Sequence, residues 1–159
     1  MKNLILGVLI CFLFLPIKAH ASEDTYLSEE IQDACVEIGT DYGICPELIM
    51  AMIEKESSGR KNVVSESGHI GLMQITPRFH QERIDRLGVY DLTDIKGNIL
   101  VGTDYLNELF EKHSDIYMVL MSYNMGERKA TELYEQEIYS NYAVSITERS
   151  AELEILHGK

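Results

Sequence analysis

The chain has 159 residues, which suits one small domain, and it carries a formal net charge of −12 at pH 7. Nucleic acids and anionic membrane surfaces are themselves negatively charged, so such an acidic chain is poorly suited to bind either of them. Length and charge therefore indicate one acidic folded domain and argue against a nucleic-acid-binding protein.

Residues 1–21 predict a secretory signal peptide, followed by a domain over residues 22–159. Lys2 supplies a positive charge, an apolar segment covers 4–16, and Ala19-His20-Ala21 matches an A-x-A cleavage site. The alternative is an uncleaved N-terminal anchor, although the apolar segment is short for a membrane span. Cleavage would remove two lysines and no acidic residue, which leaves a net charge of −14. Export would take the protein to a periplasm or to an extracellular cell wall.

Two cysteines, Cys35 and Cys45, lie in the part of the chain that would be exported. An oxidising compartment favours a disulfide between them, whereas the alternative is two free thiols packed as small apolar groups. None of the five histidines is paired at a metal-ligand spacing, so we expect neither a metal ion nor a cofactor. His69, His80 and His113 are expected on the surface.

The residues after the leader predict a mainly helical domain. Apolar residues recur at helical spacing, between Pro, Asp and Gly end signals, in seven segments: about 31–42, 46–57, 77–87, 95–112, 115–124, 127–137 and 141–156. Residues 60–70 are typical of a polar loop, in which a small strand pair is an open alternative, and 72–75 of a short helical turn. Gly102 costs about 1 kcal/mol relative to Ala inside a helix, so it predicts close packing of helices there.

Glu56 is the first candidate for chemistry, because it belongs to the apolar stripe of the second helix. It comes four residues after Met52 and three after Ile53. Burial disfavours the charged form of a carboxyl group, so a buried Glu has a raised pKa and can act as a general acid near neutral pH. The alternative is a Glu near a helix end whose carboxyl group reaches water.

A second carboxylate is expected beside the first in most glycoside-cleaving sites. Glu54 lies on a different face of the helix, Glu66 falls in the polar loop, and neither Asp91 nor Asp94 has a comparable setting. Some glycan-cleaving enzymes need only one carboxylate. The lack of a clear partner for Glu56 is therefore compatible with an enzyme of that one-carboxylate type.

Tyr123 and Asn124 form a second polar cluster, placed at the predicted end of a helix and followed by Gly126. A Tyr ring can stack on a sugar, and an Asn amide can bond its hydroxyl or amide groups. The alternative is an amphipathic core Tyr and an Asn that only ends the helix.

These segments together resemble the lytic transglycosylase domain of the soluble, lysozyme-like superfamily. Four motifs in the order and spacing of that family carry the resemblance over about residues 30–150: residues 48–57; Ser65, Gly68 and 71–77; Asn98-Ile99, Gly102 and Tyr105-Leu106; and 122–126, which is similar to its "AYNAG" motif, with Tyr142 matching a Tyr of the final helix. Met125 departs from the family pattern, because it stands where Ala is usual.

The resemblance implies a mainly α, compact lysozyme-like domain with a substrate cleft. It implies cleavage of the β-1,4 bond between N-acetylmuramic acid and N-acetylglucosamine in peptidoglycan, with formation of 1,6-anhydromuramic acid. Glu56 would be the single catalytic acid/base. The substrate would be contacted or oriented by Ser65, Gln74, Tyr123, Asn124 and Tyr142.

Two alternatives stay open beside this lyase. A muramidase would hydrolyse the same bond with water and would need a second carboxylate or a group that positions water. A non-catalytic glycan-binding module of a cell-wall-spanning machine would need no turnover. A small exported monomer suits an enzyme that opens the wall locally for a secretion or conjugation apparatus.

Overall fold

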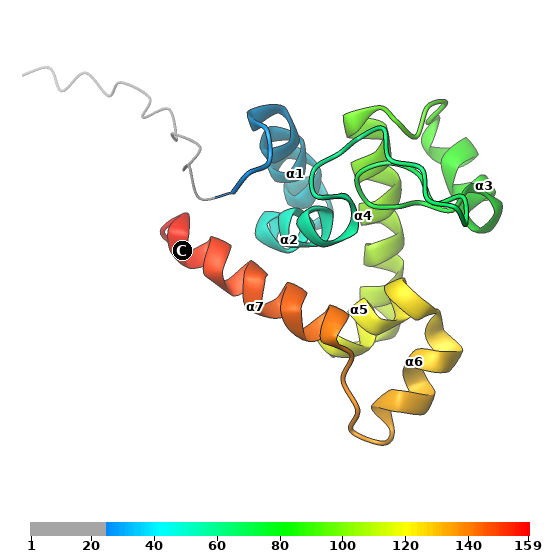
Figure 1. Ribbon diagram of the computed structural model, residues 1–159, viewed down its shortest axis with the longest axis vertical. Helices are drawn as coiled ribbons and strands as arrows, with labels where there is room; N and C mark the ends of the chain where they lie inside the picture. Colours follow the sequence, from blue (N-terminus) through cyan, green and yellow to red (C-terminus); the bar gives the residue numbers. More distant parts are fainter. Residues whose placement is uncertain (1–24) are drawn as a thin grey trace, which may run out of the picture.

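The computed structural model describes residues 25–159, which form seven helices connected by loops (Figure 1). The helices are α1 (Glu29–Tyr42), α2 (Pro46–Ser57), α3 (Pro77–Leu87), α4 (Ile95–Lys112), α5 (Ile116–Met125), α6 (Glu127–Tyr134) and α7 (Asn141–Leu156). The predicted mainly α fold is confirmed, and each helix lies where the apolar pattern predicts it. The predicted signal peptide lies outside the described residues.

The helix ends coincide with local signals in the sequence. Asp94 accepts a hydrogen bond from the backbone N–H of Gly97 at the start of α4, and Asp115 accepts from two N–H groups at the start of α5. Pro46 and Pro77 occupy the first positions of α2 and α3, where a helix does not need the missing N–H. Short-range chemistry therefore decides where these helices begin.

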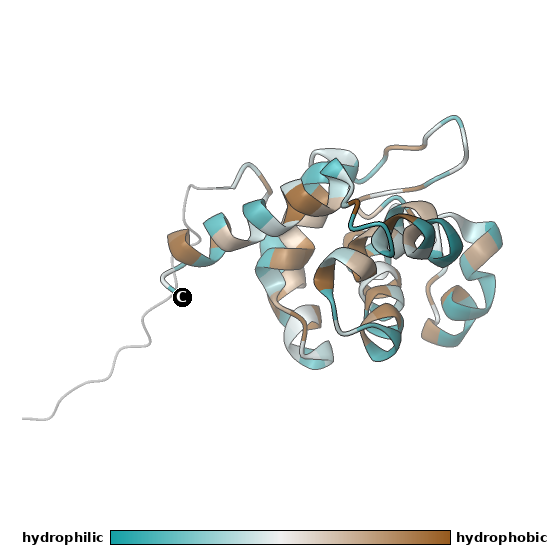
Figure 2. Ribbon diagram, turned by 90° about the horizontal axis from the view of Figure 1, so that it is seen from below, coloured by the Kyte–Doolittle hydropathy of each residue, from teal (hydrophilic) through white to brown (hydrophobic). Residues whose placement is uncertain are grey.

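Helix α2 lies at the centre of the molecule and packs against α1 and α7 (Figure 1). Helix α1 also packs against α4, while α5 contacts α4, α6 and α7. Hydrophobic and hydrophilic residues are interspersed along the helices (Figure 2), and many of the hydrophobic ones form one buried core. The largest fully buried side chains come from α2, α4, α5 and the loop before α3: Ile49, Met50, Met52, Ile53, Leu72, Met73, Ile75, Ile99, Leu106, Leu109, Leu120 and Met121.

The loop between α2 and α3 folds back on itself without forming a strand pair. It contains isolated antiparallel bridges between Val64 and Ile70 and between Ile70 and Ile75. The expected short helical turn is a single tight turn, in which the N–H of Gln74 donates to the carbonyl of Gly71 over 3.2 Å.

Asn98 of α4 fixes this loop in place. Its side-chain oxygen accepts from the N–H of Met73 over 2.8 Å, and its amide nitrogen donates to the carbonyls of Ile70 and Leu92 over 2.9 and 2.8 Å. Asn98 is almost fully buried, so all three bonds are shielded from water. Gly71 is required beside it, because a Cβ there would lie 2.3 Å from the Asn98 amide nitrogen.

Gly102 has a different neighbour from the expected one. A Cβ at this position would lie 2.4 Å from Met73 Sδ. The close approach is therefore made by the buried loop residue Met73 and not by another helix. The neighbour differs from the expected one because the loop before α3 packs against α4 as part of the core.

The predicted disulfide is wrong for this structure, because Cys35 and Cys45 are both free thiols. Cys35 is fully buried on α1, and burial raises the pKa of its thiol. Cys45, half-buried before α2, donates instead to Oε2 of Glu47 over 3.1 Å. The alternative of two separately packed thiols is the one that the structure bears out.

Glu47, in the first turn of α2, is a buried acid with several hydrogen-bond partners. It accepts from Lys159 over 2.7 Å and from Nδ1 of His157 over 2.9 Å, in addition to the Cys45 thiol. Burial alone would raise the pKa of Glu47, but these bonds outweigh burial and lower its pKa to about 2. The segment after α7 is thereby joined to the first turn of α2.

Within residues 25–159, no helix combines the length and the apolar composition that crossing a membrane requires.

Candidate active site

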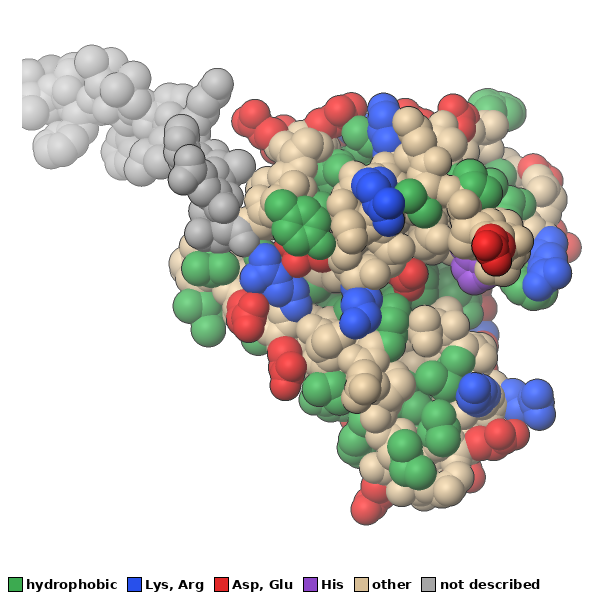
Figure 3. All heavy atoms as spheres, in the orientation of Figure 1, with side chains coloured by type: hydrophobic (Ala, Val, Ile, Leu, Met, Phe, Trp, Pro, Cys, Tyr) green, Lys and Arg blue, Asp and Glu red, His purple; other side chains and the backbone are tan. Residues whose placement is uncertain are grey.

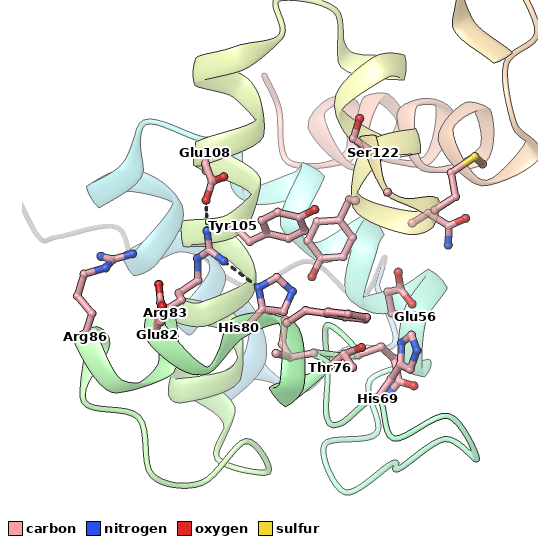
Figure 4. Close-up of a pocket in the computed structure, with 17 residues that line it drawn as sticks. Glu56, His69, Thr76, His80, Glu82, Arg83, Arg86, Tyr105, Glu108 and Ser122 are labelled. Carbon is pink, nitrogen blue, oxygen red and sulfur yellow. Dashed lines mark hydrogen bonds and ion pairs between the residues drawn. The ribbon is translucent and has the colours of Figure 1, made fainter. Parts of the chain in front are cut away.

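A pocket of about 860 Å³ lies between the end of α2, the loop before α3, and helices α3, α4 and α5 (Figure 4). In the space-filling view the surface is notched between the part that contains α3 and the part that contains α6 (Figure 3). The pocket is lined by Glu56, His69, Gln74, Ile75, Thr76, Phe79, His80, Glu82, Arg83, Arg86, Tyr105, Glu108, Ser122, Tyr123, Asn124, Met125 and Gly126.

Glu56 enters the pocket from the last turn of α2 and is half-buried. Burial raises the pKa of its carboxyl group, and this effect outweighs the hydrogen bond from Tyr142 and the charge of Lys55, which both lower the pKa. The buried-stripe interpretation of Glu56 therefore agrees with the structure. A carboxyl group with a raised pKa can keep its proton closer to neutral pH than an ordinary Glu.

Two tyrosines lie next to this carboxyl group. Tyr142 of α7 donates its hydroxyl to Oε1 of Glu56 over 2.5 Å. Tyr123 of α5 donates to the carbonyl of Met73 over 3.0 Å, which ties α5 to the loop before α3. Burial and the neighbouring Glu56 raise the pKa of both phenols well above their usual range, so both stay neutral.

Gln74 and Asn124 line the pocket from the loop and from the end of α5. Gln74 has a positive φ of 50°, and its amide nitrogen donates to the carbonyl of Gly71 over 2.9 Å, which fixes the direction of the amide. Asn124 is exposed.

Ser65 lies outside the set of lining residues, although it was expected to contact the same ligand as Gln74. Its hydroxyl accepts from the N–H of His69 over 3.0 Å, and His69 does line the pocket. The structure thus brings four of the predicted residues together in one pocket: Glu56, Gln74, Tyr123 and Asn124. Tyr142 joins them through its bond to Glu56. Ser65 is connected to the pocket only through His69.

None of the candidate second carboxylates lies in the pocket. Glu54 is bound to Arg149 over 2.7 Å on another face of α2, Asp91 accepts from Thr93, and Asp94 caps α4. The two other acids of the pocket are Glu82 and Glu108, which lie at the end remote from Glu56 (Figure 4). Glu108 is held there by ion pairs with Arg83 and Lys112.

The remote end of the pocket contains residues that the sequence analysis missed. His80 is half-buried and packs against Tyr105 at a tilted angle of 56°, with their ring centroids 4.6 Å apart. Burial and the charge of Arg83 lower the pKa of His80 to about 4. The expectation of three surface histidines is therefore wrong: His69 and His80 line the pocket and His113 is half-buried.

A spacing signal for this cluster does exist in the sequence. His80 and Arg83 are three residues apart, which places them on one face of a helix. The short α3 has a single buried residue, Ile84, so its apolar pattern does not reveal that this polar face is covered by α4.

The arrangement is suited to proton transfer inside a groove. Glu56 can donate a proton to a ligand oxygen, and the Tyr142 hydroxyl stabilises the carboxylate that remains. Among residues 25–159, no three His, Cys, Asp or Glu side chains are grouped so that they could hold a metal ion.

Comparison with known proteins agrees with this geometry. Residues 33–143 match the family described as the transglycosylase SLT domain. A transglycosylase of Enterobacteria phage PRD1 is 32% identical over 89 residues, which cover 56% of this chain and 32% of that protein. Membrane-bound lytic murein transglycosylase E of Buchnera aphidicola subsp. Baizongia pistaciae is 38% identical over 103 residues, or 55% of this chain and 49% of that one.

Solved structures with the same fold include larger lytic transglycosylases. The 70 kDa soluble lytic transglycosylase SLT70 of Escherichia coli superposes with a TM-score of 0.68 at 20% identity, over 80% of this chain and 24% of that one. A complex of the 70-kDa soluble lytic transglycosylase with bulgecin A gives a TM-score of 0.69 at 22% identity, over the same shares.

The chain spans only about a third to a half of the length of these two curated relatives. The family match nevertheless covers well over half of the chain, including every helix from α2 to α6 and the pocket residue Glu56. The chain belongs to the transglycosylase SLT domain family.

Proposed function

We propose that the chain is a peptidoglycan lytic transglycosylase, which cleaves the β-1,4 bond between N-acetylmuramic acid and N-acetylglucosamine and leaves a 1,6-anhydromuramic acid end. The observation that carries this proposal is Glu56, a half-buried carboxyl group with a raised pKa and no second carboxylate beside it among the lining residues. A single acid/base suffices for ring closure, because the attacking hydroxyl belongs to the substrate. Family membership and the names of the relatives support the same activity.

Glu56 acts twice in this reaction. Its carboxyl group first protonates the bridging oxygen, and the bond between that oxygen and C1 of the muramic acid breaks, which releases the N-acetylglucosamine side as an alcohol. The carboxylate then takes the proton from the C6 hydroxyl of the same muramic acid, whose oxygen bonds to C1 and closes the anhydro ring. Water is not consumed, and Glu56 ends the cycle protonated.

The groove residues receive binding roles in this proposal. Gln74 and Asn124 present amide groups to the sugars, Tyr123 presents a neutral ring beside Glu56, and Tyr142 orients and stabilises the carboxyl group. Ser65 acts on the substrate from the edge of the groove or through the position of His69, whose N–H it binds.

Export belongs to the same proposal. Peptidoglycan lies outside the cytoplasmic membrane, and residues 1–21 have the charge, apolar segment and A-x-A site of a signal peptide. A small enzyme of this kind suits local opening of the wall for a machine that crosses it, and the similarity to a phage transglycosylase supports that context.

Product analysis tests the proposal. Purified peptidoglycan is digested with the wild type, Glu56→Gln and the matched control Glu66→Gln, whose carboxyl group is exposed in the loop away from the pocket. Mass spectrometry should find muropeptides ending in 1,6-anhydromuramic acid with the wild type and the control. Glu56→Gln should lower their rate of formation by about 10²–10⁴-fold.

Reducing-end products in place of anhydro products would contradict the lyase and establish a muramidase. The absence of any product from the wild type would favour a glycan-binding module.

A further inference from the structure

His80 lines the pocket but has no part in the proposed proton transfers. It lies in the first turn of α3, where its backbone departs from helical geometry with φ −124° and ψ 15°. Its ring packs against the ring of Tyr105, and the Tyr105 ring in turn lies 5.2 Å from the ring of Tyr123, the neighbour of Glu56. Three rings therefore connect the centre of the proposed reaction with the remote end of the pocket.

The hydrogen bond from Arg83 determines which nitrogen of His80 carries the proton. Nη1 of Arg83 lies 2.8 Å from Nδ1 of His80. A guanidinium group can only donate, so Nδ1 must accept, and the proton of the neutral ring is on Nε2. Arg83 is itself held by Asp104 over 2.7 Å and by Glu108, so the donor cannot turn away easily.

The ring of His80 is also neutral near pH 7. Its pKa of about 4 reflects burial first and then the charge of Arg83, which together outweigh the attraction of Glu108. His80 is thus a fixed, uncharged donor above about pH 5.

Nε2 of His80 lies on the side of the ring away from Arg83, toward the interior of the pocket (Figure 4). Among residues 25–159 nothing accepts a hydrogen bond from it. Phe79, the preceding residue, also lines the pocket and is 70% exposed, although most large apolar side chains are buried. A donor without an acceptor, next to the ring of Tyr105 in a pocket that Phe79 also lines, is the arrangement that a small amide with a methyl group would complete.

We propose that Nε2–H of His80 binds the acetamido carbonyl oxygen of an N-acetylated sugar, at a position along the groove beyond the sugar that contacts Glu56. This inference rests on the proposed function and adds a specificity-determining residue to it. The carbonyl is the strongest neutral acceptor that an N-acetylated sugar offers, and its methyl group would lie against Tyr105 or Phe79. A protonated amine at the same place, as in a de-N-acetylated sugar, can only donate, so it would leave Nε2–H without an acceptor and would be rejected.

Two substitutions separate the two ring nitrogens of His80. Asn places its amide near Nδ1, so His80→Asn keeps an acceptor for Arg83 and loses the donor at Nε2. Gln places its amide nitrogen near Nε2, so His80→Gln restores that donor. Both are made in the Glu56→Gln background, and affinity for a peptidoglycan tetrasaccharide is measured by calorimetry. We expect about tenfold weaker binding for His80→Asn and at most about threefold for His80→Gln.

Nitrogen-15 spectra of the histidine rings provide a readout that does not depend on activity. They should show the Nε2–H form of His80 at pH 7 and a shift of its Nε2 resonance when the tetrasaccharide binds. Equal affinity of His80→Asn and its Glu56→Gln parent, or a proton on Nδ1, would overturn the role of His80 alone. A parent that does not bind the tetrasaccharide would overturn the proposed function as well.

Discussion

The hydrogen bond from Tyr142 to Glu56 has a predictable effect on the pH dependence of the reaction. In the proposed mechanism Glu56 must be protonated to act as an acid, so activity should fall as the pH rises through its pKa. Tyr142→Phe removes a donor that stabilises the carboxylate, so the pKa of Glu56 should rise further above its usual range and the alkaline fall should move to higher pH. We also expect about 10–100-fold lower kcat/KM at the optimum.

The measurement is kcat/KM as a function of pH on soluble glycan fragments. Tyr90→Phe is the matched control, because the Tyr90 side chain is fully exposed on the loop after α3. An alkaline limb that stays in place in Tyr142→Phe would contradict the electrostatic role of Tyr142.

The two described cysteines should behave as separate thiols. Burial raises the pKa of both, so alkylation of the folded protein should modify Cys45 slowly and Cys35 only after unfolding. Peptide mapping by mass spectrometry checks this outcome. A peptide pair joined through these two residues would show that the disulfide forms after all.

At the level of single residues, the sequence predicted the burial of Glu56 but not that of His80. The position of Glu56 follows from its spacing to Met52 within one helix. The burial of His80 depends on Tyr105, which lies 25 residues later in another helix, so no local pattern reveals it. The pairing of Cys45 with Glu47 could not be predicted from a local pattern either. The Glu47 carboxylate is fixed there by Lys159, which lies at the other end of the chain.

The loop before α3 depends on one side chain of α4, which gives the next prediction. Asn98→Ala removes three hydrogen bonds and leaves the N–H of Met73 buried without a partner. We expect a loss of about 2–4 kcal/mol in the free energy of unfolding. Asn107→Ala is the control, because Asn107 lies in the same helix and its amide bonds the nearby Glu111 at the surface.

Urea unfolding followed by circular dichroism measures both variants. Asn107→Ala should stay within about 0.5 kcal/mol of the wild type. Similar stabilities of the two variants would show that the loop does not need Asn98. Asn98→Ala should also lose activity, because Met73 and Gln74 belong to the same tight turn.

Helices were easier to predict than the loop for a physical reason. Capping by Asp94 and Asp115 and the position of Pro46 act over a few residues, so they can be read from the sequence. The bridges of Ile70 and the contact of Met73 with Gly102 depend on how distant segments meet. Gly102 correctly predicted that another segment approaches α4 closely at this position. The sequence could not show that this segment is the loop residue Met73 and not a helix.

The contacts of Glu47 should affect the acid stability of the whole molecule. The pKa of Glu47 is about 2 in the folded protein, below its ordinary value near 4.5. A depressed carboxyl pKa contributes stability above the unfolded pKa, and this stability is lost as the pH falls from about 4.5 toward 2. Glu47→Gln should therefore cost about 2–3 kcal/mol at pH 7, and the difference from wild type should shrink over that range.

Thermal unfolding between pH 2 and 7 gives the comparison. Glu37→Gln is the control, because Glu37 pairs with Lys96 at an exposed site and should change stability little at any pH. A Glu47→Gln variant whose stability differs from wild type equally at pH 2 and pH 7 would contradict the assignment.

The order of the helices and the mainly α class were predictable for the molecule as a whole, since apolar periodicity and end signals recur along the chain. The docking of the segment after α7 was not, because Glu47 and Lys159 are 112 residues apart and each alone is an ordinary charged residue. The central place of α2 also follows from contacts with both ends of the described chain.

The three bonds of Asn98 bear on how this domain could be rebuilt from parts of its relatives. Its amide joins the loop before α3, through Ile70 and Met73, to the connection before α4, through Leu92. The loop before α3, which lines part of the groove, therefore cannot be exchanged on its own for the loop of another protein. A chimera that imports residues 58–76 from another protein should fold around Glu56 only when the residue at position 98 and the small residue at position 102 are imported with it.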